Sequence, residues 1–189
     1  MTNVDPFTTM LDLRSGRLDP ELEVVERRFS DMTGMYLEDE DVEVEGDPVI
    51  YRVYGIPVPA TTGNVLSSTT VIEPGTVARE YFMTKGHFHE IRDRAEIYIG
   101  LAGEGRLLMA TEAGEHVVEP MRRGTVNYVP GGWAHRSINV GDEPLVFFAA
   151  YVGDAGHDYA AIETDGFPVV LLRGDGGPEI VANPRYRRR

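Results

Sequence analysis

From about residue 48 onward, the chain is a succession of short apolar or alternating runs separated by turn residues. The runs are VIYRVYGIPV, NVLSSTTVIEPG, EYFMTKGHFH, AEIYIGLAGEG, RLLMATEAGE, TVNYVPGG and PLVFFAAYVG. Near-regular spacing of this kind is typical of an antiparallel sandwich or barrel. The 21 glycines and 12 prolines among the 189 residues supply the turns that such a fold needs. No helical pattern separates the runs, so the sequence disfavours a doubly wound parallel sheet.

Residues 1–47 do not share this pattern, and we expect them to form a short N-terminal extension. Within it, Asp19-Pro20 is followed by acidic residues and then by basic ones, which predicts a small helix over residues 20–32, ended by Gly34. We therefore divide the chain into an N-terminal extension (1–47), a barrel (48–165), and a C-terminal strand with a basic tail (166–189).

The composition restricts the kinds of partner and site. The chain has no cysteine, which excludes disulfides and thiolate metal sites. Its formal net charge is −13 even though four arginines crowd residues 185–189, and such an acidic protein should repel nucleic acid. The N-terminus lacks the features of a signal peptide, and no stretch approaches the roughly 18 consecutive apolar residues of a membrane span. These features predict a soluble cytoplasmic protein that binds neither nucleic acid nor a membrane.

Three of the five histidines fall in two stretches, GHFHEIRDRAEIYIGLAG at 86–103 and GTVNYVPGGWAHRSIN at 124–139. His87 and His89 are two residues apart, so on a strand both side chains would project from one face. Glu96 follows a polar, hairpin-like segment, and His135 follows a turn that could aim its ring at the same point. Imidazole and carboxylate groups suit divalent ions such as iron, manganese, nickel or zinc. The sequence therefore predicts that these four residues form a metal site inside a small barrel.

The second stretch matches the second sequence motif of the cupin family at every position. That motif is Gly, five residues, Pro-x-Gly, two residues, His, three residues and Asn. The matching residues are Gly124, Pro130, Gly132, His135 and Asn139. The resemblance implies an all-β cupin fold, a double-stranded β-helix or jelly-roll-like barrel, here with a short N-terminal extension containing a small helix.

The first cupin motif is present with two departures. Tyr81 stands where a leading Gly is usual, and six residues separate His89 from Glu96 where three or four are usual. The stretch MTKGHFHEIRDRAEIYIGLAGEG resembles the archaeal-type cupin phosphoglucose isomerases, and the similarity covers most of the chain, including AYVGDAGHDY. What this resemblance implies is interconversion of glucose 6-phosphate and fructose 6-phosphate in glycolysis and gluconeogenesis by a homodimer.

The resemblance also implies roles for individual residues. The metal ligands would be His87, His89, Glu96 and His135, with Glu96 and His135 also catalytic. Sugar and phosphate contacts would be made by Tyr51, Thr70, Thr84, Gly86, Tyr98, Tyr151, His157 and Tyr159. One divalent metal per subunit is expected, Fe²⁺ first, with Mn²⁺, Ni²⁺ and Zn²⁺ as alternatives. Lys85 is the cation nearest these residues in the sequence.

Several alternatives stay open at this point. The hydrogen could move between C1 and C2 as a proton through an enediolate, with Glu96 as the base, or as a direct hydride shift with Glu96 only a ligand. Mannose 6-phosphate could be isomerised as well or instead. Two further hypotheses are a non-catalytic sugar-binding cupin and an iron dioxygenase. Retention of all four candidate ligands argues against the first, and the hydroxyl-rich candidate set suits a sugar phosphate better than an apolar aromatic substrate.

Overall fold

The computed structural model describes residues 4–20, 24–38 and 46–188, and almost all of its regular elements are strands. The strands are β1 (Met10–Leu11), β2 (Leu18–Asp19), β3 (Val24–Arg28), β4 (Val49–Gly55), β5 (Val65–Ile72), β6 (Thr76–Val77), β7 (Glu80–Tyr81), β8 (Glu96–Ala102), β9 (Glu104–Thr111), β10 (His116–Arg122), β11 (Val126–Val129), β12 (Trp133–Asn139), β13 (Leu145–Val152), β14 (Val169–Gly174) and β15 (Gly177–Ala182). A 3₁₀ helix, η1 (Phe29–Met32), and one short α-helix, α1 (Ala160–Asp165), complete the elements.

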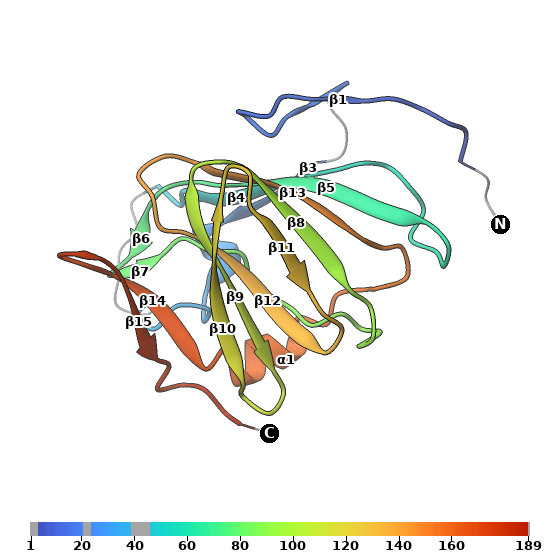
Figure 1. The fold of residues 1–189 in the computed structure, drawn as a ribbon. Helices are drawn as coiled ribbons and strands as arrows, with labels where there is room; N and C mark the ends of the chain where they lie inside the picture. The colour runs from blue at the N-terminus through green and yellow to red at the C-terminus, as the bar shows by residue number, and fades with distance from the viewer. Residues whose placement is uncertain (1–3, 21–23, 39–45, 189) are drawn as a thin grey trace.

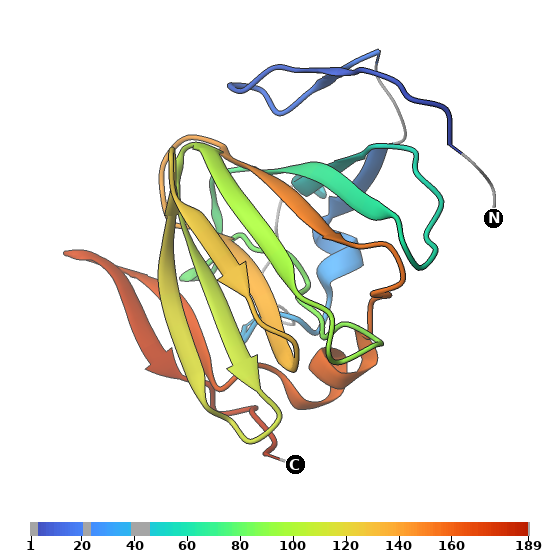
Figure 2. The same ribbon diagram turned by 45° about the vertical axis from the view of Figure 1, so that its right-hand side comes forward.

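Two antiparallel sheets form the barrel (Figures 1 and 2). The larger sheet has the order β11-β8-β13-β5-β4-β3, and the smaller has the order β10-β9-β12. Side chains from both sheets, such as Ile72, Leu107 and Phe147, belong to one continuous buried core. A third sheet, β15-β14-β7-β6, lies beside the barrel. The fold is therefore the all-β cupin barrel that the motifs predicted.

Strand β8 shows how the barrel faces are assigned. Its residues alternate, with Glu96 and Tyr98 buried and with Ile97 and Ile99 exposed by 40% and 37%. Glu96 and Tyr98 therefore share one face of the strand, with polar groups inside the barrel and apolar groups outside. A strand normally buries its apolar face. The inversion therefore marks the barrel interior near Glu96 as a polar site.

The helix predicted over residues 20–32 is wrong for most of its described length. Residues Val24–Arg28 form strand β3, which pairs with β4, and only Phe29–Met32 are helical, as the single 3₁₀ turn η1. The paired valines Val24 and Val25 are β-branched and favour extended backbone. The edge of β4 supplies hydrogen bonds for that conformation, and this tertiary pairing outweighs the helix-type charge pattern.

The C-terminal region contains two strands instead of the single one that was predicted. Strands β14 and β15 form a hairpin, and β14 also pairs with β7. Beyond them, the guanidinium of Arg185 donates hydrogen bonds to the backbone carbonyls of Tyr36 (2.9 Å) and Leu37 (2.7 Å). The first part of the basic tail is therefore tied to the N-terminal region.

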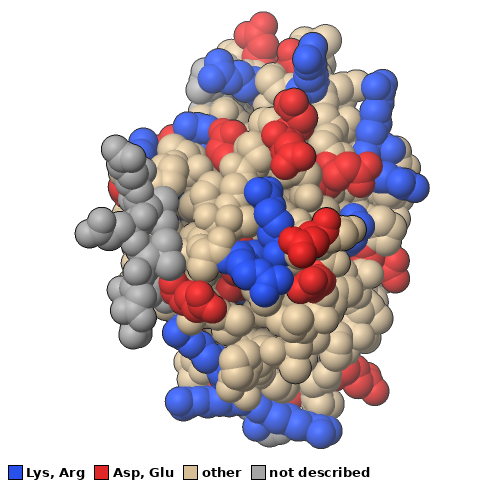
Figure 3. All heavy atoms as spheres, turned by 90° about the vertical axis from the view of Figure 1, so that its left-hand side faces the viewer, with Lys and Arg blue, Asp and Glu red and all other residues tan. Residues whose placement is uncertain are grey.

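Figure 3 views the side of the molecule that carries β14 and β15. Acidic and basic side chains are intermingled on this face, with uncharged surface between them. Within the described ranges, none of the helices has the length and apolar character needed to cross a lipid bilayer.

Candidate metal centre and substrate cavity

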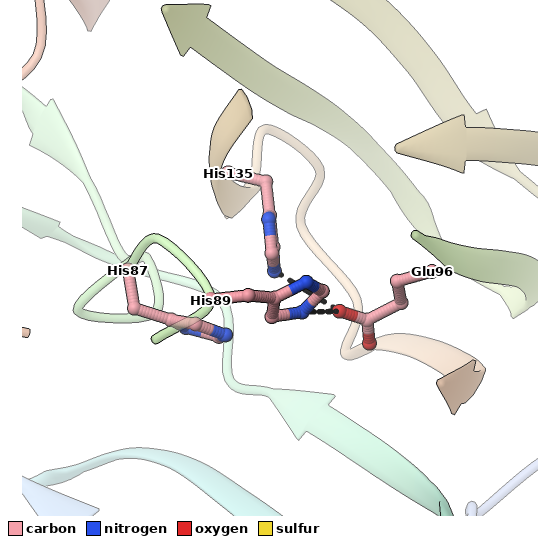
Figure 4. A group of neighbouring side chains, drawn as sticks. All are labelled: His87, His89, Glu96 and His135. Atoms are coloured by element: carbon pink, nitrogen blue, oxygen red, sulfur yellow. Dashed lines mark hydrogen bonds and ion pairs between the residues drawn. The ribbon is translucent and has the colours of Figure 1, made fainter. Parts of the chain in front are cut away.

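The structure brings His87, His89, Glu96 and His135 together inside the barrel. Each offers one ligand atom, and these atoms all lie within 4.8 Å of one another. In Figure 4 the three imidazoles and the carboxylate point toward a common centre. A pair of backbone hydrogen bonds joins His87 and His135, from each N–H to the other residue's carbonyl, at 3.2 and 3.0 Å. The side chains converge because this bridge fixes two of the four ligands side by side.

The segment that carries His87 and His89 is extended, but it is not a regular strand. It contacts its neighbours through isolated bridges at Met83, His87 and Phe88. Gly86 interrupts it with a φ of +75°, and a Cβ added there would lie 2.7 Å from the Phe167 ring. Only glycine combines this backbone conformation with so close an approach. Any larger residue at position 86 would therefore displace Phe167 or the backbone that carries His87.

The carboxylate of Glu96 is the negative group of the cluster. Its Oε2 lies 3.2 Å from Nε2 of His89 and 3.1 Å from Nε2 of His135. Burial alone would raise the pKa of Glu96, but the two neighbouring imidazoles outweigh it and lower the pKa to about 2. Glu96 is therefore ionised at neutral pH and can act as an anionic ligand.

The histidine nitrogens fit a metal ion. Burial, followed by the charges of the nearby His135, His157 and His89, lowers the pKa of His87 well below its ordinary value, so this ring is neutral at pH 7. Nε2 of His87 is buried without a hydrogen bond in the described part of the chain, and buried Nε2 of His135 has only the 3.1 Å contact to the Glu96 carboxylate. Buried polar atoms are normally hydrogen-bonded. A divalent cation would give both nitrogens a partner, and the donor set of three imidazoles and one carboxylate suits such an ion.

A cavity with an empty volume of about 590 Å³ opens beside the cluster. All eight sequence-predicted substrate contacts line it, together with Lys85 and three of the four cluster residues, His87, Glu96 and His135. The lining residues that the sequence analysis missed are Val53, Ser68, Ser137, Phe147 and Ala149. Strand periodicity could have found all five. Each lies two residues along a strand from Tyr51, Thr70, His135 or Tyr151, except Phe147, which lies four residues before Tyr151.

Tyrosine hydroxyls are the most numerous side-chain polar groups of the cavity. Burial is the main cause that raises the pKa of Tyr51 and of Tyr151 to about 12. Burial and the charge of Glu96 raise the pKa of Tyr98 well above its ordinary value, and burial raises that of Tyr159. All four phenols therefore stay protonated at neutral pH and can donate hydrogen bonds to oxygen atoms of a ligand.

His157 and Tyr159 approach the metal cluster from the loop before α1. Their rings are stacked, with centroids 5.8 Å apart and an interplanar angle of 10°. The ring of His157 also lies 4.5 Å from that of His87, centroid to centroid. Burial lowers the pKa of His157, so it is neutral at pH 7. The loop therefore supplies two ring side chains with polar atoms to one wall of the cavity.

Lys85 supplies positive charge to this cavity. It is the only lysine of the chain, and among the described residues that line the cavity it is the only lysine or arginine. Its Nζ lies 3.6 Å from a carboxylate oxygen of Glu163 on α1. That distance is long for an ion pair, so the ammonium can still turn toward an anion in the cavity.

Comparison with known proteins identifies the family. A sequence model described as "Glucose-6-phosphate isomerase (GPI)" matches residues 26–184. The chain belongs to the glucose-6-phosphate isomerase family. The glucose-6-phosphate isomerase of Pyrococcus horikoshii is 46% identical over 187 residues, covering 97% of this chain and 98% of the relative. That of Sinorhizobium medicae is 36% identical over 191 residues, covering 98% of this chain and 89% of the relative. The resemblance noted in the sequence is confirmed.

The fold of this glucose-6-phosphate isomerase family member also resembles that of a solved oxalate oxidase structure. The TM-score is 0.51 at 16% sequence identity, and the match covers 67% of this chain and 63% of that chain. The two proteins are alike in fold.

Asn139, the last residue of the second cupin motif, holds parts of the barrel together. Its buried side chain donates hydrogen bonds to the backbone carbonyls of Ile72 and Glu143, both at 2.9 Å.

Proposed function

We propose that this chain is a metal-dependent aldose–ketose isomerase that interconverts glucose 6-phosphate and fructose 6-phosphate. The observation that carries this proposal is the convergence of three imidazoles and one carboxylate at a cavity lined by hydroxyl groups. The names of the relatives support the same substrate pair. We place the reaction in glycolysis and gluconeogenesis, in the cytoplasm.

In this proposal one divalent metal per subunit is held by His87, His89, Glu96 and His135. Fe²⁺ is our first choice, with Mn²⁺, Ni²⁺ and Zn²⁺ as alternatives, because imidazole and carboxylate donors accept all four. When bound, such an ion would stabilise the negative charge that develops on the sugar oxygens during the reaction. The depressed pKa values of Glu96 and His87 support this role, since both groups are already in the deprotonated form that a metal requires.

The reaction moves one hydrogen between C1 and C2 of the open-chain sugar. If it moves as a proton, a base takes it from C2 of the aldose and returns it to C1, while the hydroxyl proton on O2 transfers to O1. Glu96 is the proposed base, although a carboxylate with a pKa of about 2 is a weak one. The alternative is a hydride shift in which Glu96 only ligates the metal. Loss of deuterium to water from 2-deuterated glucose 6-phosphate would favour proton transfer, whereas full retention would favour the shift.

We propose that Lys85 and the eight sequence-predicted contact residues bind the substrate. Lys85 and the backbone N–H of Gly86 would hold the phosphate, together with Thr70 and Thr84, because these groups supply one cation and several hydrogen-bond donors. The remaining contacts would be made by the sugar-facing rings Tyr51, Tyr98, Tyr151, His157 and Tyr159. We propose that His135 binds the metal and, because it also lines the cavity, lies next to the reacting carbons of the bound sugar.

Mannose 6-phosphate is a second proposed substrate. An enediolate intermediate loses the stereocentre at C2, so it can be reprotonated on either face unless the site shields one of them. Assaying ketose formation with both aldose phosphates would distinguish strict from dual specificity.

The test of the proposed function uses the intact protein. Metal is stripped with a chelator, single divalent ions are restored, and isomerisation is assayed under anaerobic conditions. We expect activity to vanish on chelation and to return with at least one ion. Sugar-phosphate binding without turnover in any metal form would indicate a non-catalytic binding protein. Oxygen consumption with a diol substrate, in place of isomerisation, would indicate a dioxygenase.

We also propose that the protein is a homodimer, formed through the outer face of the larger barrel sheet. That face exposes the apolar side chains Val65, Ile97, Ile99, Val126 and Tyr128. A contiguous exposed apolar surface usually marks an interaction site. Light scattering should give a dimer mass, and Ile97→Asp with Tyr128→Asp should give a monomer. A wild-type protein that is monomeric at micromolar concentration would refute this proposal.

A further inference from the structure

The residues between His89 and Glu96 contact a distant part of the chain. In this 90–95 segment, the guanidinium of Arg94 donates hydrogen bonds to both carboxylate oxygens of Asp154, from Nε to Oδ1 at 2.8 Å and from Nη2 to Oδ2 at 2.9 Å. The side chains of Arg94 and Asp154 are only 28% and 16% exposed. Paired hydrogen bonds between an arginine and a carboxylate are geometrically specific, and partial burial reduces screening by water. This pair is therefore a stronger constraint than an ordinary surface ion pair.

A second arginine of the same segment holds the other end of the 154–158 segment. Nη2 of Arg92 lies 2.6 Å from Oδ2 of Asp158, and the guanidinium lies over the Phe88 ring, 4.6 Å from its centroid. Backbone hydrogen bonds also join these two parts of the chain. Ile91 N–H donates to Ala155 at 3.1 Å, and Phe88 and Asp158 exchange a pair at 3.2 and 2.8 Å. The 154–158 segment is thus fixed near both of its ends.

The cavity residues His157 and Tyr159 lie within this segment and directly after it. No hydrogen bond from the ring of His157 is found in the described structure, and the contacts of that ring are with other rings: His87, Tyr151 and Tyr159. Ring packing of this kind leaves the position of His157 dependent on its backbone. The backbone, in turn, is held by the two arginine–aspartate pairs at its ends together with the backbone hydrogen bonds of Ala155 and Asp158.

The 90–95 segment also supports the metal ligands. The carbonyl of Arg94 lies 2.9 Å from Nδ1 of His89. The carbonyl of Arg92 accepts a hydrogen bond from the N–H of Gly132, three residues before His135. A Cβ added to the preceding residue, Gly131, would lie 2.8 Å from the backbone of Asp93, so the two loops are in close contact. One segment therefore contacts the ligand-bearing loops and the loop that carries His157.

We infer that Arg92 and Arg94 are positioning residues, which set His157 and Tyr159 over the metal cluster by holding Asp158 and Asp154. This inference rests on the proposed function for its catalytic consequence, but not for its structural one. Neither arginine side chain lines the substrate cavity. Their effect on the reaction must therefore pass through the loop that they hold.

The test compares Arg94→Gln, Asp154→Asn and the double variant, all in the metal-loaded full-length protein. Arg52→Gln is the control, because Arg52 forms a similarly half-buried pair with Glu73 at 2.8 Å on the barrel surface. We expect each single variant to raise KM for fructose 6-phosphate about tenfold, since a small misplacement of binding groups is costly. The double variant should be no worse than either single one, because both remove the same pair. The control should leave KM unchanged.

Hydrogen–deuterium exchange provides a readout that does not need activity. Amides of residues 154–158 should exchange faster in Arg94→Gln and Asp154→Asn than in wild type, and at the wild-type rate in Arg52→Gln. Unchanged exchange and unchanged KM in a folded variant would overturn the inference. If Arg94→Gln does not fold, Asp154→Asn decides by the same two measurements. If wild type isomerises neither sugar phosphate, the proposed function fails, while the exchange data still decide the positioning role.

Discussion

The carbonyl oxygen of Arg94 lies 2.9 Å from Nδ1 of His89, and this contact turns Nε2 of the same ring toward Glu96 at 3.2 Å. A carbonyl can only accept a hydrogen bond, so it favours the proton on Nδ1 and leaves the Nε2 lone pair for a metal. Such outer contacts orient metal ligands and tune their affinity. A polar segment between two ligands therefore contributes to the site without binding the metal itself.

The first prediction concerns the metal. Replacing His135 with Ala removes one of four ligands, so metal content measured by elemental analysis and isomerase activity should both fall by at least about 100-fold. His116→Ala is the matched control, because His116 is exposed on β10 and lies outside the cluster. Full metal content in His135→Ala would contradict the assignment of the ligands.

The second prediction concerns the phosphate. Lys85→Gln removes the cavity's cation, and KM for glucose 6-phosphate should rise roughly tenfold, because a hydrogen bond to a charged group contributes about 1.5–3 kcal/mol. Inhibition by inorganic phosphate should weaken in parallel. Lys85→Arg keeps the charge and should recover part of the loss. A normal response to phosphate in Lys85→Gln would show that the anion binds elsewhere.

The third prediction concerns acid stability. The hydrogen bonds from Arg94 and Thr62 hold the pKa of Asp154 below its ordinary value of 3.8. A depressed carboxyl pKa stabilises the folded state at pH values above the unfolded pKa, and this contribution is lost as pH falls through the folded pKa. Asp154→Asn should therefore lower Tm at pH 7, and the difference from wild type should shrink as pH is taken below about 3.8. A difference that is constant from pH 7 to pH 2 would contradict the ion pair.

The fourth prediction concerns the core. Leu107 is fully buried on β9, so Leu107→Ala should reduce the free energy of unfolding by about 2–5 kcal/mol through lost burial and the cavity left behind. Val117→Ala, on the neighbouring strand β10 with 38% exposure, should cost much less. Urea denaturation monitored by circular dichroism would measure both. Equal losses in the two variants would show that β9 does not face the core.

Some features of the chain could be predicted because they depend on local spacing. The strand class follows from alternation and turns, and the shared face of Glu96 and Tyr98 follows from the two-residue period of a strand. The four residues of the candidate metal site could be named because the family pattern places them at defined positions. The helix predicted over residues 20–32 failed for a related reason. The charge pattern around Val24 and Val25 is a local signal, whereas the pairing with β4 that makes these residues a strand is a contact between distant parts of the chain.

The sequence by itself determined the fold class, the family and the four residues of the candidate metal site, because all three follow from residue types and their spacing along the chain. Only the tertiary structure decided what surrounds them. The pairing of Arg94 with Asp154, sixty residues apart, and the packing of His157 on His87 arise from how the loops meet when the barrel closes. Contacts of that kind depend on three-dimensional distance, which the spacing of residues along a single chain does not encode.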